Sequence, residues 1–220
     1  MALSEKQKQK KRQQRAQKRK KAGAARQPVS AAGSARVMAK SYARFPVHEV
    51  LCPGDLDDEG MGNLLLSRKG PDGLLGVSFF LVDKYCLGVK NAFFTEVDED
   101  EYLEARQRML YRTSAEPVSM HPACMRKLVE SAVDYARDLG FPPHKDYGAA
   151  QAIFGDIDAS ACPTRFEFGD QGKPLFIAGP DDNPAKSRKI IKQLEKRCGA
   201  GGYDYIAWLD DEEMLAPDDL

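Results

Sequence analysis

The strongest strand signal in the chain lies between residues 62 and 97. Residues 74–82 form a nine-residue apolar run, and strand-like segments at 63–69 and 86–94 flank it. A Gly-Pro-Asp-Gly turn at 70–73 joins the first two segments, so the pattern predicts a three-stranded antiparallel meander. Because the middle run has too few polar residues to present a wet face, we expect a central strand covered by helices on at least one side.

Two helices are expected to cover this sheet. The first begins at Pro122, which suits the first turn of a helix, and ends before Gly140. Its apolar residues recur every three or four positions and form one wide stripe: Met125, Leu128, Val129, Ala132, Val133, Ala136 and Leu139. The second helix has Asn183 as its cap and Pro184 behind it, and it ends before Gly199.

Shorter elements complete the expected fold. Residues 46–52 are typical of a first strand, and the acidic residues 98–101 begin a helix that continues to residue 112. The segments 165–168 and 174–177 flank a turn and predict a hairpin. A short helix and a last edge segment are expected at 147–154 and 203–209. The sequence therefore predicts an α+β fold, in which an antiparallel β-meander sheet is covered by helices.

Charge divides the chain into parts. Residues 1–44 hold fourteen Lys and Arg and one acidic residue, Glu5, which gives a net charge of +13. Residues 45–220 hold nineteen Lys and Arg and thirty-two Asp and Glu, which gives −13. A segment so rich in like charges and so poor in apolar residues does not collapse alone. We expect a disordered basic arm and linker over 1–44, with the linker at 27–43, a single folded domain over 45–209 and an acidic tail over 210–220.

The cysteines favour a reducing compartment. They are odd in number, widely spaced and not preceded by an apolar leader: Cys52, Cys86, Cys124, Cys162 and Cys198. This pattern is typical of reduced thiols in a cytoplasmic protein rather than of a disulfide framework. The chain also lacks a run of about 18 apolar residues, so no membrane-spanning helix is expected.

The basic arm is the strongest functional signal. Its cations alternate mainly with Gln and Ala and have no aromatic neighbours, which suits phosphate neutralisation better than the reading of bases. We expect a protein that associates with RNA or the ribosome, with DNA as an alternative, and not with a membrane, because the arm has no apolar face. A solvated tail and a nuclear-localisation tract are the competing interpretations. The residues expected to contact phosphates are Lys6, Lys8, Lys10, Lys11, Arg12, Arg15, Lys18, Arg19, Lys20, Lys21 and Arg26.

A second interpretation is a Mg²⁺-dependent nuclease or other phosphodiester hydrolase. Asp83 ends the most apolar strand, and Asp156 and Asp158 lie two positions apart in a predicted loop. Three carboxylates that converge would hold Mg²⁺, and outside this interpretation no cofactor is expected. Asp-x-Asp pairs are also frequent in turns, where they cap the local backbone.

Zinc and anion binding are weaker alternatives. His48 with Cys52, and His121 with Cys124, have ligand-like spacing and together would supply four zinc ligands. No Cys-x2-Cys pair accompanies them, and burial in the core explains the cysteines equally well. The loop 179–184 leads into a helix that carries Lys186, Ser187 and Arg188, which would suit an anion, although ordinary helix capping is the favoured interpretation.

A third interpretation, from another class, is an adaptor whose folded domain binds a protein and whose arm is incidental. It predicts an exposed apolar patch on that domain. The charge division also suggests that the arm folds back on the acidic residues of the tail at 210–219, or on those at 55–59, until a polyanion displaces it. The sequence leaves the oligomeric state open, because an edge of the meander would be able to pair with a second copy.

Overall fold

The structure is a computed structural model that describes residues 31–110, 116–180 and 182–207. The chain divides into two compact units, Met1–Ser34 and Ala35–Leu220. Most of the first unit lies outside the described residues, so the fold is that of the second. Among the described helices, none combines the length and the apolar character that crossing a membrane requires.

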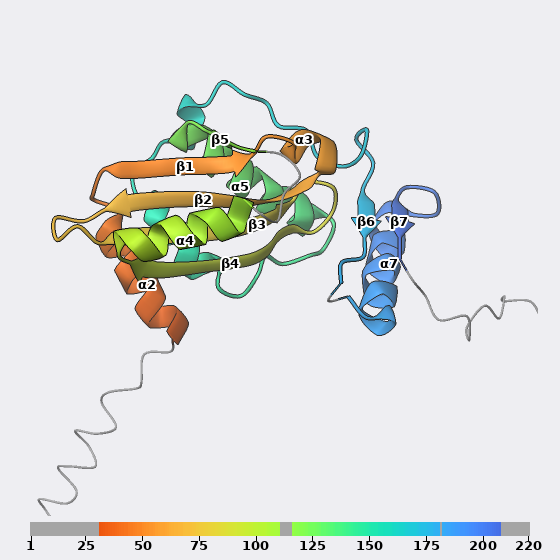
Figure 1. Ribbon diagram of the computed structural model, residues 1–220. Coiled ribbons are helices and arrows are strands. Elements are labelled where there is room, and N and C mark those ends of the chain that lie inside the picture. Colours follow the sequence, from red (N-terminus) through yellow and green to blue (C-terminus); the bar gives the residue numbers. More distant parts are fainter. Residues whose placement is uncertain (1–30, 111–115, 181, 208–220) are drawn as a thin grey trace, which may run out of the picture. The chain divides into compact units, whose positions relative to one another are not determined.

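A five-stranded antiparallel sheet forms the centre of the second unit, in the order β4-β3-β2-β1-β5 (Figure 1). Its strands are β1 (Val47–Pro53), β2 (Met61–Lys69), β3 (Leu75–Asp83), β4 (Gly88–Val97) and β5 (Pro117–Ser119). The predicted meander is confirmed as β2-β3-β4, and β3 is an interior strand in which eight of nine residues are buried. The first strand is confirmed as β1, whereas the three-residue β5 is too short to show a period in the sequence.

One face of the sheet packs against α5 (Pro122–Asp138), α6 (Tyr147–Ala150) and the 3₁₀ helix η1 (Gln151–Phe154). Figure 1 shows α5 behind the sheet. The stripe predicted from Pro122 is buried, and the ring of Phe80 stacks on that of Phe154 at 5.4 Å. The main core of the molecule therefore lies on this side.

The other face packs against α4 (Glu99–Leu110), the helix predicted to follow the acidic residues 98–101 (Figure 1). Tyr102 is its buried contact with the apolar residues of β2 and β3. The Tyr102 hydroxyl donates to Glu49, and Arg106 pairs with the same carboxylate at 3.1 Å. The sheet is thus an inner layer between helices. The short helix α3 (Leu56–Glu59) joins β1 to β2.

Arg68 on β2 is a buried cation that joins three segments of backbone. Its side chain is 4% exposed, and its guanidinium donates to the carbonyl oxygens of Ile153 at 2.9 Å and Phe154 at 3.0 Å. A third bond runs to the carbonyl of Phe45. Arg68 therefore satisfies the last carbonyls of η1, which have no partner inside that helix.

The segment expected as a linker at 27–43 differs in the structure, because helix α2 (Ala31–Tyr42) occupies most of it. Ala39 and Tyr42 are 0% and 4% exposed. The Tyr42 ring lies directly over Gly76, where a Cβ atom would come within 2.3 Å of it. The Tyr42 hydroxyl donates to Glu96 at 2.7 Å. Contacts with the sheet, rather than a local signal, therefore stabilise this helix.

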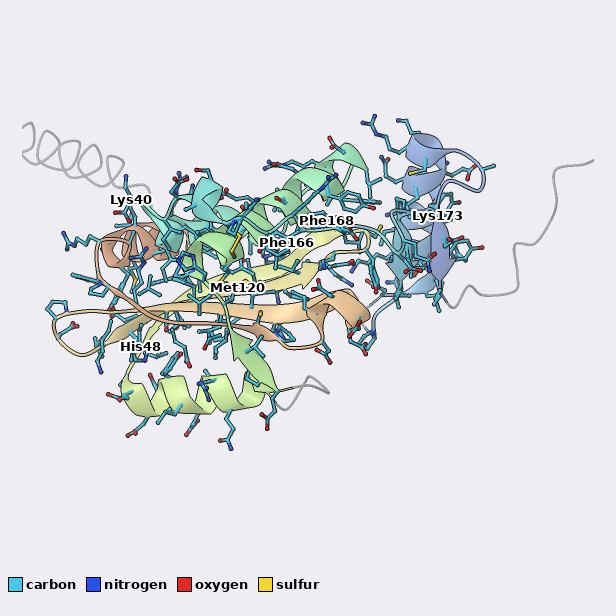
Figure 2. All side chains as sticks on the ribbon, turned by 90° about the horizontal axis from the view of Figure 1, so that it is seen from above. Lys40, His48, Met120, Phe166, Phe168 and Lys173 are labelled. Carbon is cyan, nitrogen blue, oxygen red and sulfur yellow. A yellow bond between two sulfur atoms is a disulfide. The ribbon has the colours of Figure 1, made fainter. Side chains whose placement is uncertain are left out.

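The hairpin predicted from 165–168 and 174–177 is wrong. Strand β6 (Leu175–Ile177) pairs in parallel with β7 (Asp204–Ile206), and α7 (Pro184–Cys198) connects them. Only the turn of the hairpin persists, as a bridge between Asp170 and Lys173. The reason is that Phe166 and Phe168 pack against the main core, on the α5 side of the sheet (Figure 2).

The helix predicted from Pro184 is confirmed, but its predicted place over the sheet is wrong. The buried face of α7 joins a separate apolar cluster made by Cys86, Leu139, Phe176, Ile190 and Leu194. Cys86 comes from the β3–β4 turn and Leu139 from the end of α5, so α7 packs beside an end of the sheet and not on its face. Parallel strands need a crossover connection, which α7 supplies for β6 and β7.

Candidate nucleic-acid interface

Helix α7 is strongly basic. Its fifteen residues include six Lys and Arg and one acidic residue, Glu195, and all seven of these side chains are exposed. The whole of residues 45–220 carries a net charge of −13, so α7 is a basic surface on an acidic domain. Averaged over residues 45–220, the charge shows only an acidic excess, so the sequence does not reveal this basic surface.

Capping and burial fix which side of α7 faces solvent. The Asn183 side chain accepts a hydrogen bond from the Lys186 N–H at 2.9 Å, which confirms the predicted cap. Ile190 and Leu194 face the apolar cluster, and Gln193 donates to the carbonyl of Leu139 at 3.0 Å. The opposite side of the helix is left to the cations.

Two of the six cations have partners. Lys186 pairs with Asp182 at 2.5 Å, and Arg197 donates to the carbonyl of Asp138. Within the part of the chain that the structure describes, the other four form no ion pair; they are Arg188, Lys189, Lys192 and Lys196. We call these four residues the α7 stripe. Lys173, labelled near α7 in Figure 2, pairs instead with Asp204 at 2.8 Å.

The α7 stripe lowers the stability of its own helix. Arg188, Lys192 and Lys196 succeed one another at intervals of four residues, and like charges at that spacing repel by about 0.2–0.5 kcal/mol per pair. Cations in the first turns also oppose the helix dipole, and Lys186, Arg188 and Lys189 all lie there. A pattern that destabilises its own helix does not serve the fold, so the stripe suits the binding of an anionic partner.

The loop at 179–184 is occupied by groups of its own. The Asp182 side chain, 3% exposed, accepts from the Gly179 N–H at 2.9 Å and pairs with Lys186; Lys90 lies 3.9 Å away. Burial acts to raise the pKa of Asp182, but the bonds from Lys186 and Gly179 and the charge of Lys90 together lower it below the ordinary value. This carboxylate holds the position that an external anion would need, which supports the favoured capping interpretation.

The three predicted catalytic aspartates have separate roles. Asp83 is 5% exposed and accepts from the N–H groups of Tyr85 and Cys86, both at 2.9 Å. Asp158 is exposed and caps the 3₁₀ helix η2 (Ala159–Ala161), where bonds from Ser160 lower its pKa. Asp156 is exposed. The described residues contain no group of three or more His, Cys, Asp or Glu that would hold a metal ion. The geometry therefore gives the nuclease interpretation no support.

The candidate zinc ligands also have other partners. Cys124 forms a disulfide with Cys162, and His121 Nδ1 accepts from the Ala123 N–H at 3.2 Å as the cap of α5. The Cys52 thiol donates to the carbonyl of Val118, and burial raises the pKa of Cys52 to about 11. Figure 2 shows His48 on the side of the sheet where α4 lies, with its ring 5.5 Å from that of Tyr102.

The expectation that all the cysteines are reduced is wrong for Cys124 and Cys162. The first turn of α5 and the residue after η2 bring their Cα atoms to 4.9 Å, well within disulfide range. Their separation of 38 residues hid this contact in the sequence. Cys52, Cys86 and Cys198 are free, as expected, and burial raises the pKa of Cys86 far above that of an ordinary thiol.

The predicted phosphate-contacting residues of the arm, from Lys6 to Arg26, lie outside the described residues, and so does the acidic tail at 210–220. Searches with this chain among protein-family models, curated proteins and solved structures gave no match. The α7 stripe is therefore the described feature that bears most directly on a polyanionic partner.

Proposed function

We propose that this protein binds RNA, free or in the ribosome, and that the basic arm supplies most of the affinity through phosphate contacts. One observation carries the proposal: residues 1–44 hold fourteen cations and one acidic residue, whereas the rest of the chain is acidic. A segment of this kind binds polyanions mainly by counterion release. The exposed cations of α7 support the same partner from within the folded domain.

The test compares the full chain with a variant in which the eleven arm cations, from Lys6 to Arg26, are changed to Gln. This change removes charge and keeps length. Binding to a short unstructured RNA is measured by fluorescence anisotropy between about 50 and 200 mM salt. We expect the variant to lose at least about tenfold in affinity at low salt and most of the slope of log K against log salt.

Two controls sharpen the result. A sister variant that replaces the ten Gln and Ala residues between Ala2 and Ala25 by Ser and Gly changes composition without changing charge, and it should bind as the full chain does. Gel analysis of the RNA after incubation with Mg²⁺ reports any cleavage. Equal affinity and equal slope for the full chain and the Gln variant would overturn the proposal, and cleavage would favour the nuclease interpretation instead.

A further inference from the structure

We propose that α7 and β7 together form a site for single-stranded nucleic acid, in which the α7 stripe contacts phosphates and Tyr205 stacks on a base. This inference rests on the proposed function and names the form of nucleic acid that the folded domain takes. It begins from Tyr203 and Tyr205, whose rings stack at 6.3 Å with an interplanar angle of 25°. Tyr205 is 46% exposed, and every residue of β7 is exposed.

Apolar packing places this tyrosine pair beside α7. Tyr203 packs against the cluster that contains Ile190 and Leu194 of α7, and burial together with the neighbouring Glu195 carboxylate raises the pKa of Tyr203. Glu195 is the single acidic residue of α7. The ring of Tyr205 lies over the ring of Tyr203 and is therefore held next to the same side of the helix.

Helix periodicity then brings the cations to that side. Lys192 and Arg188 precede Glu195 by three and seven residues, so the three side chains lie in one row on the helix surface. Lys189 and Lys196 lie next to this row and widen the stripe. An aromatic surface and a line of cations thus run side by side on one lobe of the molecule.

This combination suits a single strand. Base stacking on an aromatic side chain requires an exposed base face, which a duplex offers only at its ends. The cations follow the phosphate backbone and an aromatic ring stacks on any base, so the binding should tolerate sequence. A membrane is the less suitable partner, because the apolar residues of α7 pack in its cluster with Phe176 and Leu139, so the helix presents no apolar face to insert.

The experiment uses the full chain and four variants. Tyr205→Leu removes the aromatic ring and Tyr205→Phe keeps it. Arg188→Gln combined with Lys192→Gln removes two charges from the α7 stripe. Phe93→Leu is the matched control, since Phe93 is a similarly exposed aromatic residue, at 47%, on β4. Each protein is titrated with an unstructured RNA and with an RNA duplex of the same length at several salt concentrations, and circular dichroism checks the fold.

We expect Tyr205→Leu to weaken binding to the single strand by at least about fivefold, and to leave duplex binding and the salt slope unchanged because no charge is lost. Tyr205→Phe and Phe93→Leu should bind like the unmodified chain. The double Gln variant should reduce the slope for the single strand by about 1.4, as expected for two lost phosphate contacts.

The outcomes separate this inference from the proposed function. If the arm variant and the double Gln variant lose affinity but Tyr205→Leu does not, the inference is wrong and the proposed function stands. If no variant affects RNA binding, both are wrong. The inference is also overturned if Tyr205→Leu weakens binding to the single strand and to the duplex equally. It is likewise overturned if Tyr205→Leu weakens binding to anionic phosphatidylserine vesicles but not to RNA.

Discussion

Asp83 shows how a carboxylate that resembles a catalytic residue in the sequence takes a structural role. It lies at the end of β3, is 5% exposed, and caps the turn into β4 by accepting from two backbone N–H groups. Burial raises its pKa above the ordinary value of 3.8, while Lys90 and the backbone bonds act in the opposite direction. The ionised form of Asp83 therefore lowers the stability of the fold, whereas its carboxyl oxygen stabilises the turn by accepting the two hydrogen bonds.

The variant Asp83→Asn tests this role through the pH dependence of stability. A folded-state pKa above the unfolded value means that the folded protein holds the proton more tightly than the unfolded chain. The contribution of Asp83 to the free energy of unfolding therefore falls as pH rises from about 3.8 upward. Asn keeps the acceptor oxygen and does not titrate. We expect the free energy of unfolding of Asp83→Asn, relative to the unmodified chain, to rise between about pH 4 and pH 7 in urea titrations.

Two further substitutions act as controls for Asp83. Asp83→Ala removes the acceptor as well, and its free energy of unfolding should lie about 1–3 kcal/mol below that of Asp83→Asn at all pH values, because two N–H groups are left without a partner. Asp156→Asn makes the same exchange at an exposed position, away from the turn that Asp83 caps. A difference between Asp83→Asn and the unmodified chain that does not vary with pH would show that the carboxyl does not have a raised pKa.

At the scale of elements, α2 decides where the folded unit begins. The sequence predicts a boundary at residue 45, whereas the structure divides the chain between Ser34 and Ala35 and buries Ala39 and Tyr42. Contacts of Tyr42 with Gly76 and Glu96 hold α2 on the sheet. A chain that begins at residue 35 should therefore be stable, and a chain that begins at residue 45 should not be.

Substitutions of Tyr42 in the full chain measure the same contact. We expect Tyr42→Ala to lower the free energy of unfolding by about 3 kcal/mol, the cost of removing a buried aromatic ring. Tyr42→Phe loses only the bond to Glu96 and should cost about 1 kcal/mol. Both values come from urea unfolding, with Arg36→Ala on the exposed side of α2 as the unaffected control. Equal stability of Tyr42→Ala and the unmodified chain would restore the linker interpretation.

The elements that the sequence predicts correctly carry their signals locally. The helix from Pro122 has a complete apolar stripe and Pro punctuation, and the meander has the turn at 70–73. The elements it misses gain their stability from distant contacts: α2 needs Gly76, β6 needs β7, and the disulfide joins Cys124 to a residue 38 positions away. No window of the sequence contains both partners of such a contact, so its pattern does not reveal them.

The same limit applies to the candidate site at the scale of the whole molecule. The charge of the arm is legible in the sequence because it is continuous. The α7 stripe is not, because its cations acquire one exposed side only when Ile190 and Leu194 are buried, and because Tyr203 packs beside α7 only in the fold. Counting charge over 45–220 therefore hides a basic surface inside an acidic total.

The division of charge between the ends of the chain leads to the last prediction. Six acidic residues lie between 210 and 219, a few positions after β7, and they would compete with a polyanion for the arm and for the α7 stripe. Removing residues 210–220 should therefore tighten RNA binding at low salt, by several-fold. The gain should disappear by about 0.5 M salt, where screening acts over a few ångströms.

A second variant separates charge from bulk in this test. It keeps all residues of the tail and replaces its six acids by Asn and Gln. If electrostatic competition is the cause, this variant and the shortened chain gain affinity together and lose the gain at the same salt concentration. If only the shortened chain gains, the tail obstructs the site by its volume, and if neither gains, the arm and the α7 stripe bind RNA without competition from the acidic end.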